Sequence, residues 1–288
     1  MIIHQTEILK KDGHTILWAA LEMDKKRDHF PPHLWYRVSD QYAFGLKPQG
    51  DAFLVAALLA GMHFGENIEV HGAVSPRLAY HLSEYQTLIS IREPDSVQTV
   101  DIKYNHIAPI DKGGSAVGTT FSGGADSLFS IFNHLPAQQS DPNYQVTHGL
   151  FVRGGFGMLP SSRKEYMKYY RHFQQEATGL DMEVIELETN MFSIIHKRMN
   201  GPYMFGPLLI SSALALSGLF KRFYIPSSWD HHTLLNTAHA SDPLADGFLS
   251  TDTIDIIHHG STHRRVEKLV EIADWDVAHR TLTVCIDP

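Results

Sequence analysis

The sequence predicts an α/β protein with a mostly parallel sheet in residues 111–288 and a smaller mixed α/β domain in residues 1–110. From about residue 116 onward, short apolar runs alternate with longer helical segments, as in repeated strand–helix–strand units. Residues 111–115 contain two glycines, which makes them the best boundary between the two parts.

Strands and helices are mixed in the N-terminal part. Strand-like segments lie at residues 15–21, 67–74 and 97–107. Residues 51–64 are strongly apolar and predict a helix. Pro76 predicts the start of another helix that runs to about residue 83, because proline is favoured in a first helical turn. No motif in this part carries recognisable chemistry.

The C-terminal part alternates more regularly. Strand-like runs lie at residues 116–121, 146–152, 183–187, 222–226 and 254–257. Helical runs lie at residues 128–132 and 161–179. Residues 202–220 carry no charge and are long enough to span a bilayer, but a buried helix on a parallel sheet has the same pattern. We expect the buried helix and no membrane association.

The motif from Ser122 to Ser127 reads Ser-Gly-Gly-Ala-Asp-Ser and lies between a strand-like and a helix-like run. The first N–H groups of a helix have no partner within it, and the helix dipole adds partial positive charge there. Gly123 and Gly124 allow close approach of the backbone to an anion, and the serine hydroxyls add donors. The segment therefore predicts a phosphate-binding loop. The alternative is an ordinary helix start that Asp126 caps.

This motif resembles the SGGxDS signature of the PP-loop ATP pyrophosphatase superfamily, the adenine nucleotide alpha-hydrolase-like enzymes. They include asparagine synthetases and 7-cyano-7-deazaguanine synthase. The resemblance is specific in the loop, looser over about residues 110–288, and absent from residues 1–108. It implies a doubly wound sheet of the HUP-like Rossmann type. It also implies cleavage of ATP between the α and β phosphates and activation of a substrate as an adenylate.

The resemblance assigns roles to particular residues. ATP would bind the loop residues Ser122, Gly123, Gly124, Ala125, Asp126 and Ser127. Asp126 would also hold Mg²⁺, and Asp126 and Ser127 would take part in catalysis. Ligands bind at the strand ends of such sheets, which adds Val152, Arg153, Ser227 and Asp230 as cofactor-binding or pocket residues.

A basic segment near the end of the chain gives a second match. As in the late region of synthase-like members, a short strand is followed by Arg264, Arg265 and Lys268. Basic groups opposite the loop would stabilise departing pyrophosphate, so Arg264 and Lys268 are expected to be catalytic. The alternative is a solvated helix face.

Related synthases continue past a Val-Cys pair like Val284-Cys285 into a cysteine-rich, zinc-binding tail. This sequence ends at Pro288, which puts a structural zinc in doubt.

Two other features of the sequence match known sites only in part. Residues 113–120 have the glycine spacing of a Walker A loop, but Thr119 stands in place of the lysine and the segment leads into a strand. The chain has 19 histidines, including His231-His232, His258-His259 and His263, without a matching carboxylate set. Surface and hydrogen-bonding roles are therefore expected for most of them.

Composition limits the partners. The net charge of −8 argues against a broad nucleic-acid surface, although a local basic groove stays open. The single cysteine, Cys285, excludes an internal disulfide framework and fits a reducing, cytoplasmic location. The first twelve residues lack the apolar core of a signal peptide. A homo-oligomer is compatible with the sequence.

The leading hypothesis is an ATP-dependent adenylating enzyme. It would use ATP and Mg²⁺ to activate a carboxylate or amide of a small molecule, which a nitrogen nucleophile then attacks. The alternative is a non-catalytic ATP- or AMP-binding regulatory protein of the same fold. An RNA-modifying enzyme of the superfamily is disfavoured by the acidity of the chain and its single cysteine.

Overall fold

The structure is a computed structural model, and it describes residues 1–25, 27, 30–110, 112–153, 163–194, 205–236 and 241–283. The first part contributes β1 (Ile2–Ile3), β2 (Glu7–Lys11), β3 (His14–Glu22), β4 (His33–Ser39), the 3-10 helix η1 (Asp40–Gly45), α1 (Asp51–Phe64), β5 (Ile68–Val74), α2 (Pro76–Arg92) and β6 (Ile102–Ile107). The predicted helix over residues 51–64 is confirmed. The helix at Pro76 is longer than predicted, because Leu82, Tyr85 and Ile89 continue its buried side.

The second part begins with β7 (Ala116–Thr120), α3 (Ala125–Asn133), β8 (His148–Arg153), α4 (Arg163–Thr178), β9 (Glu183–Thr189) and the 3-10 helix η2 (Met191–Ile194). It continues with α5 (Phe205–Ala215), β10 (Phe220–Pro226), α6 (His231–Asn236), the 3-10 helix η4 (Asp246–Leu249), β11 (Asp255–His259), α7 (Arg265–Glu271) and α8 (Asp276–Thr281). All five strands predicted for this part are present.

In the described residues, eleven strands form one sheet in the order β11-β10-β7-β8-β9-β4-β3-β1-β5-β6, with β2 paired to β3. Strands β11, β10, β7, β8 and β9 are all parallel. The chain leaves β7 toward β8 and β9 on one side, then returns to place β10 and β11 on the other. The predicted α/β class with a mostly parallel sheet is confirmed, and the strand order reverses between β7 and β10.

One antiparallel pairing joins the two parts of the chain. Strand β4 pairs with β9, so that Tyr36 lies opposite Thr189 and Arg37 opposite Glu188. Strands β3, β2 and β1 then follow β4 in antiparallel order, and β5 and β6 are parallel to β1. The sheet therefore crosses the boundary predicted at residues 111–115. The division into two domains stays a prediction.

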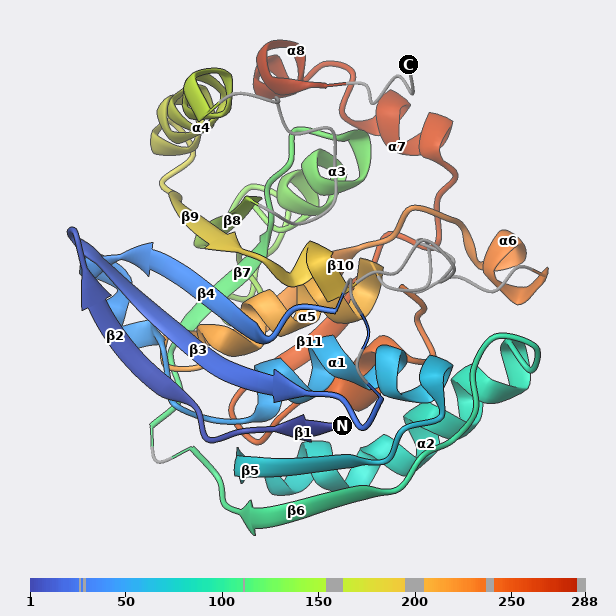
Figure 1. The fold of residues 1–288 in the computed structure, drawn as a ribbon. Coiled ribbons are helices and arrows are strands. Elements are labelled where there is room, and N and C mark those ends of the chain that lie inside the picture. The colour runs from blue at the N-terminus through green and yellow to red at the C-terminus, as the bar shows by residue number, and fades with distance from the viewer. Residues whose placement is uncertain are drawn as a thin grey trace.

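Helices cover the parallel region on both faces (Figure 1). On one face, α1 and α5 pack on a large core that includes Phe53, Ile210 and Phe223. On the other face, α3 and α4 pack on a second core that includes Leu128 and Phe173. The helix α5 is buried, as predicted, although residues 202–204 of that prediction lie outside the described residues. Within the described ranges, no helix is both long and apolar enough to cross a membrane.

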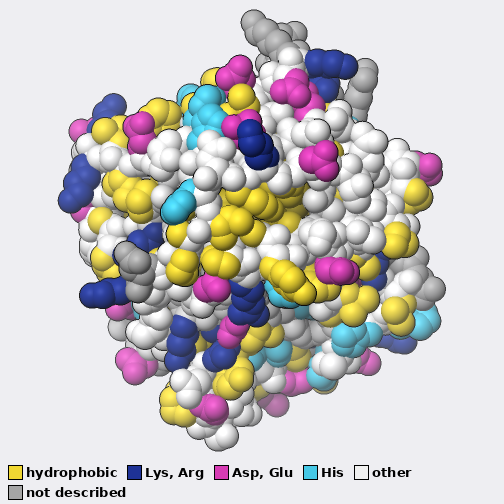
Figure 2. Space-filling model, turned by 90° about the horizontal axis from the view of Figure 1, so that it is seen from below, with side chains coloured by type: hydrophobic (Ala, Val, Ile, Leu, Met, Phe, Trp, Pro, Cys, Tyr) yellow, Lys and Arg dark blue, Asp and Glu magenta, His cyan; other side chains and the backbone are white. Residues whose placement is uncertain are grey.

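The underside of the molecule in Figure 1 carries β5, β6 and α2. Figure 2 shows this side, where apolar side chains gather in the middle and basic, acidic and histidine side chains lie around them. The two charge signs are interspersed, so no broad basic surface is visible on this face.

Candidate functional site

The predicted phosphate loop connects β7 to α3. Gly123 has φ +74°, a left-handed conformation that glycine adopts without strain. Gly124 is extended, with φ −75° and ψ 157°, and it is the N-cap residue directly before α3. No side chain caps this helix start, and Asp126 is already within its first turn. The alternative in which Asp126 caps an ordinary helix is therefore wrong.

The two serines of the motif are linked within the loop. Ser127 Oγ donates to the Gly124 carbonyl oxygen at 2.9 Å and lies 3.2 Å from Ser122 Oγ. The Gly124 N–H is 3.4 Å from Ser122 Oγ. Ser127 is buried, whereas Ser122 is exposed. The sequence motif thus places its hydroxyls and the helix start around one small volume, as an oxyanion site requires.

Residues far along the chain brace this loop. Thr283 N–H donates to the Gly123 carbonyl at 2.8 Å, and Thr283 Oγ1 is 3.3 Å from the Ser122 carbonyl. A β-carbon built on Gly123 would lie 2.7 Å from Phe173 Cζ and 2.7 Å from the Thr281 carbonyl oxygen. Sequence reasoning missed Thr283 and Phe173, because no local pattern connects them with the loop.

The basic segment reaches the loop through Lys268 and Arg265. Lys268 Nζ donates to Asp126 Oδ1 at 3.1 Å, and Arg265 Nη2 donates to Asp126 Oδ2 at 3.0 Å. The Lys268 side chain is 1 % exposed, whereas that of Arg265 is 57 % exposed. Burial lowers the pKa of Lys268, and the Asp126 carboxylate opposes that effect. The alternative of a solvated helix face is wrong for Lys268.

Lys268 also ties the loop to β10. Its Nζ donates a short hydrogen bond to the carbonyl oxygen of Ser227, directly after β10. The loop follows β7, and β7 and β10 are the neighbours between which the strand order reverses. In open α/β sheets, the crevice at the carboxyl ends of such strands is the usual ligand site. Lys268 therefore lies at the edge of the sheet where ligands of open α/β sheets commonly bind.

The side chains of Ser227 and Asp230 shape the segment after β10. Ser227 is buried, and its Oγ donates to the Trp229 carbonyl at 2.6 Å. Asp230 accepts hydrogen bonds from the N–H and the hydroxyl of Thr233 at 3.0 and 3.2 Å. The bond from the Thr233 N–H is the main cause that lowers the pKa of Asp230. Ser227 was predicted from its place just beyond a strand end, and its main-chain carbonyl is the group that contacts Lys268.

The side chain of the predicted residue Arg264 does not contact Asp126. Arg264 is exposed, and its N–H donates to Glu267 Oε2 at 2.7 Å where α7 begins. Its charge contributes to lowering the pKa of Asp230. Arg264 thus lies beside the basic pair, but Arg265 is the neighbour that contacts Asp126.

Val152 and Arg153 lie at the end of β8. Val152 is half-buried against the larger core. Arg153 Nη1 donates to Glu188 Oε1 at 2.9 Å, and its guanidinium lies 5.0 Å from the centre of the Tyr166 ring. Glu188 also binds Arg37 of β4. The structure therefore connects Arg153 with β9 and β4.

Asp126 is the residue that the sequence predicts to hold Mg²⁺. Among the described residues, no group of three or more histidine, cysteine or acidic side chains is arranged to hold a metal ion. Mg²⁺ that accompanies nucleotides is commonly held by one or two carboxylates together with the phosphates. Asp126, at the helix start with Lys268 and Arg265 on its oxygens, fits that role if phosphates take over the two cations. The Val284-Cys285 pair lies outside the described residues.

A buried histidine fastens the loop helix to β11. His259 Nδ1 lies 3.0 Å from Ser130 Oγ of α3, and its ring is 4.4 Å from that of His134. Burial lowers the pKa of His259 to about 3, and the neighbouring charges of His134 and Lys268 act in the same direction. His259 is therefore neutral in the folded protein at neutral pH.

These contacts bring Ser122, Gly123, Gly124, Asp126 and Lys268 together at the carboxyl ends of β7 and β10. Comparison of the chain with protein-family models, with curated proteins and with solved structures gives no match.

We expect the two loop glycines to respond differently to alanine. Gly123→Ala should destabilise the protein by about 1–3 kcal/mol, because the residue is left-handed and its neighbours leave no space. Gly124→Ala should leave the stability unchanged to within about 0.5 kcal/mol, because its new β-carbon meets only Ser122 Oγ, at 3.4 Å. Urea unfolding of both variants checks this. Equal losses would contradict the described loop conformation.

Acid should destabilise the protein partly through His259. Its pKa of about 3 lies below the value of about 6.5 expected in the unfolded chain, so the stabilisation is complete above pH 6.5 and is lost as the pH falls. Between pH 7 and pH 5 the loss from this one group should be about 2 kcal/mol. Urea unfolding at both pH values should show a smaller acid effect in His259→Gln. His263→Gln, at a more exposed ring, serves as the control.

Proposed function

We propose that the protein is an ATP-dependent adenylating enzyme of the PP-loop, HUP-like type. It would cleave ATP to AMP and pyrophosphate to activate a carboxylate or amide of a small molecule for attack by a nitrogen nucleophile. A cytoplasmic location is consistent with this function, because ATP and a reducing environment are found there.

One observation carries the proposal. The buried ammonium of Lys268 joins Asp126 of the glycine loop to the end of β10, at the point where the strand order reverses. Burial of a lysine ammonium costs free energy unless the charge is paired. A helix face that binds no ligand would gain little stability from such a buried charge. A site that binds and releases a polyphosphate needs a preformed cation at this place.

ATP binding would use groups that are already oriented. The amides of Gly123 and Gly124 and the start of α3 would hold the β and γ phosphates, with Ser122 and Ser127 as further donors. Adenine would lie near Leu150 and Val152 at the end of β8. Arg265, exposed beside Asp126, is free to exchange its carboxylate partner for a phosphate oxygen because both are anions.

The reaction would need no protein nucleophile. An oxygen of the substrate attacks the α phosphorus, and the bond from that phosphorus to the bridging oxygen of the β phosphate breaks. Lys268 and Arg265 would stabilise the negative charge that gathers on the departing pyrophosphate. A nitrogen nucleophile then attacks the activated carbon, and AMP leaves. Mg²⁺, when bound, would supply further charge neutralisation, with Asp126 as its protein ligand.

Product analysis tests the proposal. We expect AMP and pyrophosphate when the protein is incubated with ATP, Mg²⁺, ammonia and a panel of carboxylic acids. Asp126→Asn, which keeps the shape of the side chain and removes its charge, should lose this activity while staying folded.

Two results would exclude adenylation. ADP with inorganic phosphate as the main products would mean cleavage at the γ phosphate. ATP binding by calorimetry without turnover across the panel would favour the non-catalytic regulatory alternative.

Arg265 and Lys268 should make the protein bind ATP more tightly than AMP. Arg265→Ala or Lys268→Met should weaken ATP binding about tenfold or more, because charge-assisted hydrogen bonds contribute about 1.5–3 kcal/mol. AMP affinity should change less, since it lacks the β and γ phosphates. Arg264→Ala is the matched comparison on the same helix and should lose less than Arg265→Ala. Equal ATP affinity in Arg265→Ala, Lys268→Met and the unchanged protein would show that these cations do not touch the polyphosphate.

A further inference from the structure

Strand β2 is an open edge of the sheet. Within the described residues its strand pairing is with β3 alone, and Figure 1 shows it at the outer margin of the molecule. Its five residues, Glu-Ile-Leu-Lys-Lys, are all exposed. Ile8 is 44 % and Leu9 is 50 % exposed. An exposed edge with large apolar side chains is a surface on which another strand can pair.

The β2–β3 hairpin determines which backbone groups face outward. Asp12 and Gly13 form its two-residue turn with φ +51° and +74°, so Lys11 and His14 flank the turn as a pair. Flanking residues of such a turn exchange both hydrogen bonds, and the pattern alternates along the strand. Glu7, Leu9 and Lys11 therefore bond to β3. The N–H and C=O groups of Ile8 and Lys10 point to the free edge.

We propose that two copies of the chain associate through β2, which pairs antiparallel with β2 of the second copy about a two-fold axis at Leu9. Ile8 and Lys10 of one copy then exchange hydrogen bonds with Lys10 and Ile8 of the other. Each Glu7 lies opposite Lys11 of the second copy, in the closer, non-hydrogen-bonded type of pair. The two sheets become one continuous sheet.

The charges on β2 favour this register over the neighbouring ones. The two strands can shift against each other only in steps of two residues, because only then do their outward N–H and C=O groups stay paired. In one direction the shift places Lys10 opposite Lys10 and Leu9 opposite Lys11. In the other direction Glu7 falls opposite Leu9, and no pair of opposite charges forms. The proposed register is thus the one that pairs both acids with lysines and keeps Lys10 away from its own copy.

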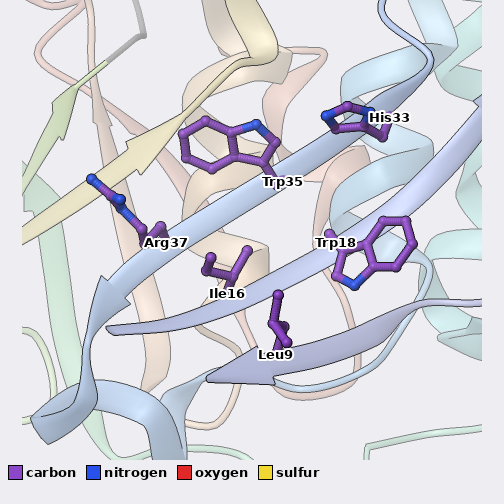
Figure 3. A pocket seen from close by; sticks show the side chains of 6 residues that line it. All are labelled: Leu9, Ile16, Trp18, His33, Trp35 and Arg37. Atoms are coloured by element: carbon purple, nitrogen blue, oxygen red, sulfur yellow. The ribbon is translucent and has the colours of Figure 1, made fainter. Parts of the chain in front are cut away.

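The apolar surface beside β2 supports a second copy as the occupant. An open groove of about 310 Å³ lies on this face of the sheet, lined by Leu9, Ile16, Trp18, His33, Trp35 and Arg37 (Figure 3). Leu9 lies at the end of the groove that is nearest the free edge, in register with Ile16. Pairing about Leu9 would bring the two grooves together as one apolar strip, and Leu9 would contact its own copy.

The other edges of the sheet are less suited to self-pairing. Strand β6 carries Lys103 and has no acidic residue, so a second copy of β6 would offer this lysine no opposite charge. On β11, Asp255 already binds Arg77 at 2.8 Å and Arg222 at 3.5 Å. Of the edge strands that the structure describes, β2 has the self-complementary sequence.

Sedimentation velocity of charge variants tests the pairing. We expect a dimer with a dissociation constant on the order of micromolar, because a single strand pairing makes a small interface. Glu7→Lys and Lys11→Glu should each weaken it about tenfold or more, since each places like charges opposite one another. An equimolar mixture of the two variants should regain the dimer, because every pair is then of opposite charge. Lys103→Glu is the control and should behave as the unchanged protein.

Cross-linking locates the axis. In a Cys285→Ser background, Leu9→Cys should form an intermolecular disulfide on mild oxidation, because the two β-carbons are direct neighbours. Ile8→Cys should not, because its partner is Lys10. A monomer across the concentration range, a dimer insensitive to either charge reversal, or a failure of the mixture to associate would overturn the proposal. Thermal melting of each variant confirms that it is folded.

Discussion

The contact of Lys268 with Asp126 and Ser227 is the interaction on which the site depends. A lysine that is almost completely buried needs a fixed partner, because desolvation of a charge costs several kcal/mol. Asp126 supplies that partner from the loop, and the Ser227 carbonyl supplies an acceptor from the end of β10. The pair thereby holds three elements together: α3, β10 and α7. The same contact keeps a cation beside the start of α3.

The remaining loop contacts follow from that arrangement. Gly123 turns left-handed so that the chain can leave β7 and begin α3. Phe173 of α4 and Thr283 near the end of the chain pack against it. The hydroxyls of Ser122 and Ser127 then lie 3.2 Å apart. His259, neutral and buried, attaches the middle of α3 to β11. The loop is therefore held in place from the C-terminal segment and, through α3, from β11.

The antiparallel pairing of β4 with β9 also leaves one face of the added strands open. It extends the sheet beyond β9 and creates an open face on β2, β3 and β4, where the two tryptophans Trp18 and Trp35 lie opposite each other. The inner side of the same strands faces the large core through Leu17 and Tyr36. One set of strands thus serves the core with one face, while its other face and free edge remain available for association. Glu188, between Arg37 and Arg153, links that open face to the end of β8.

The sequence by itself determined the parallel half of the fold and the loop. Apolar runs bounded by glycine and polar residues are local signals, so α1, the strands after residue 115 and the start of α3 were predictable. Strand β4 was missed, because its pairing with β9 joins residues distant in sequence. Strand β2 was missed although Asp12-Gly13, the turn to β3, is a local hairpin signal. Only the tertiary structure shows that Arg265 and Lys268, and not Arg264, contact Asp126, because the direction of α7 decides which side chains face that carboxylate. Folding likewise brings Thr283 and the Ser227 carbonyl to the site, and no local sequence pattern predicts these contacts.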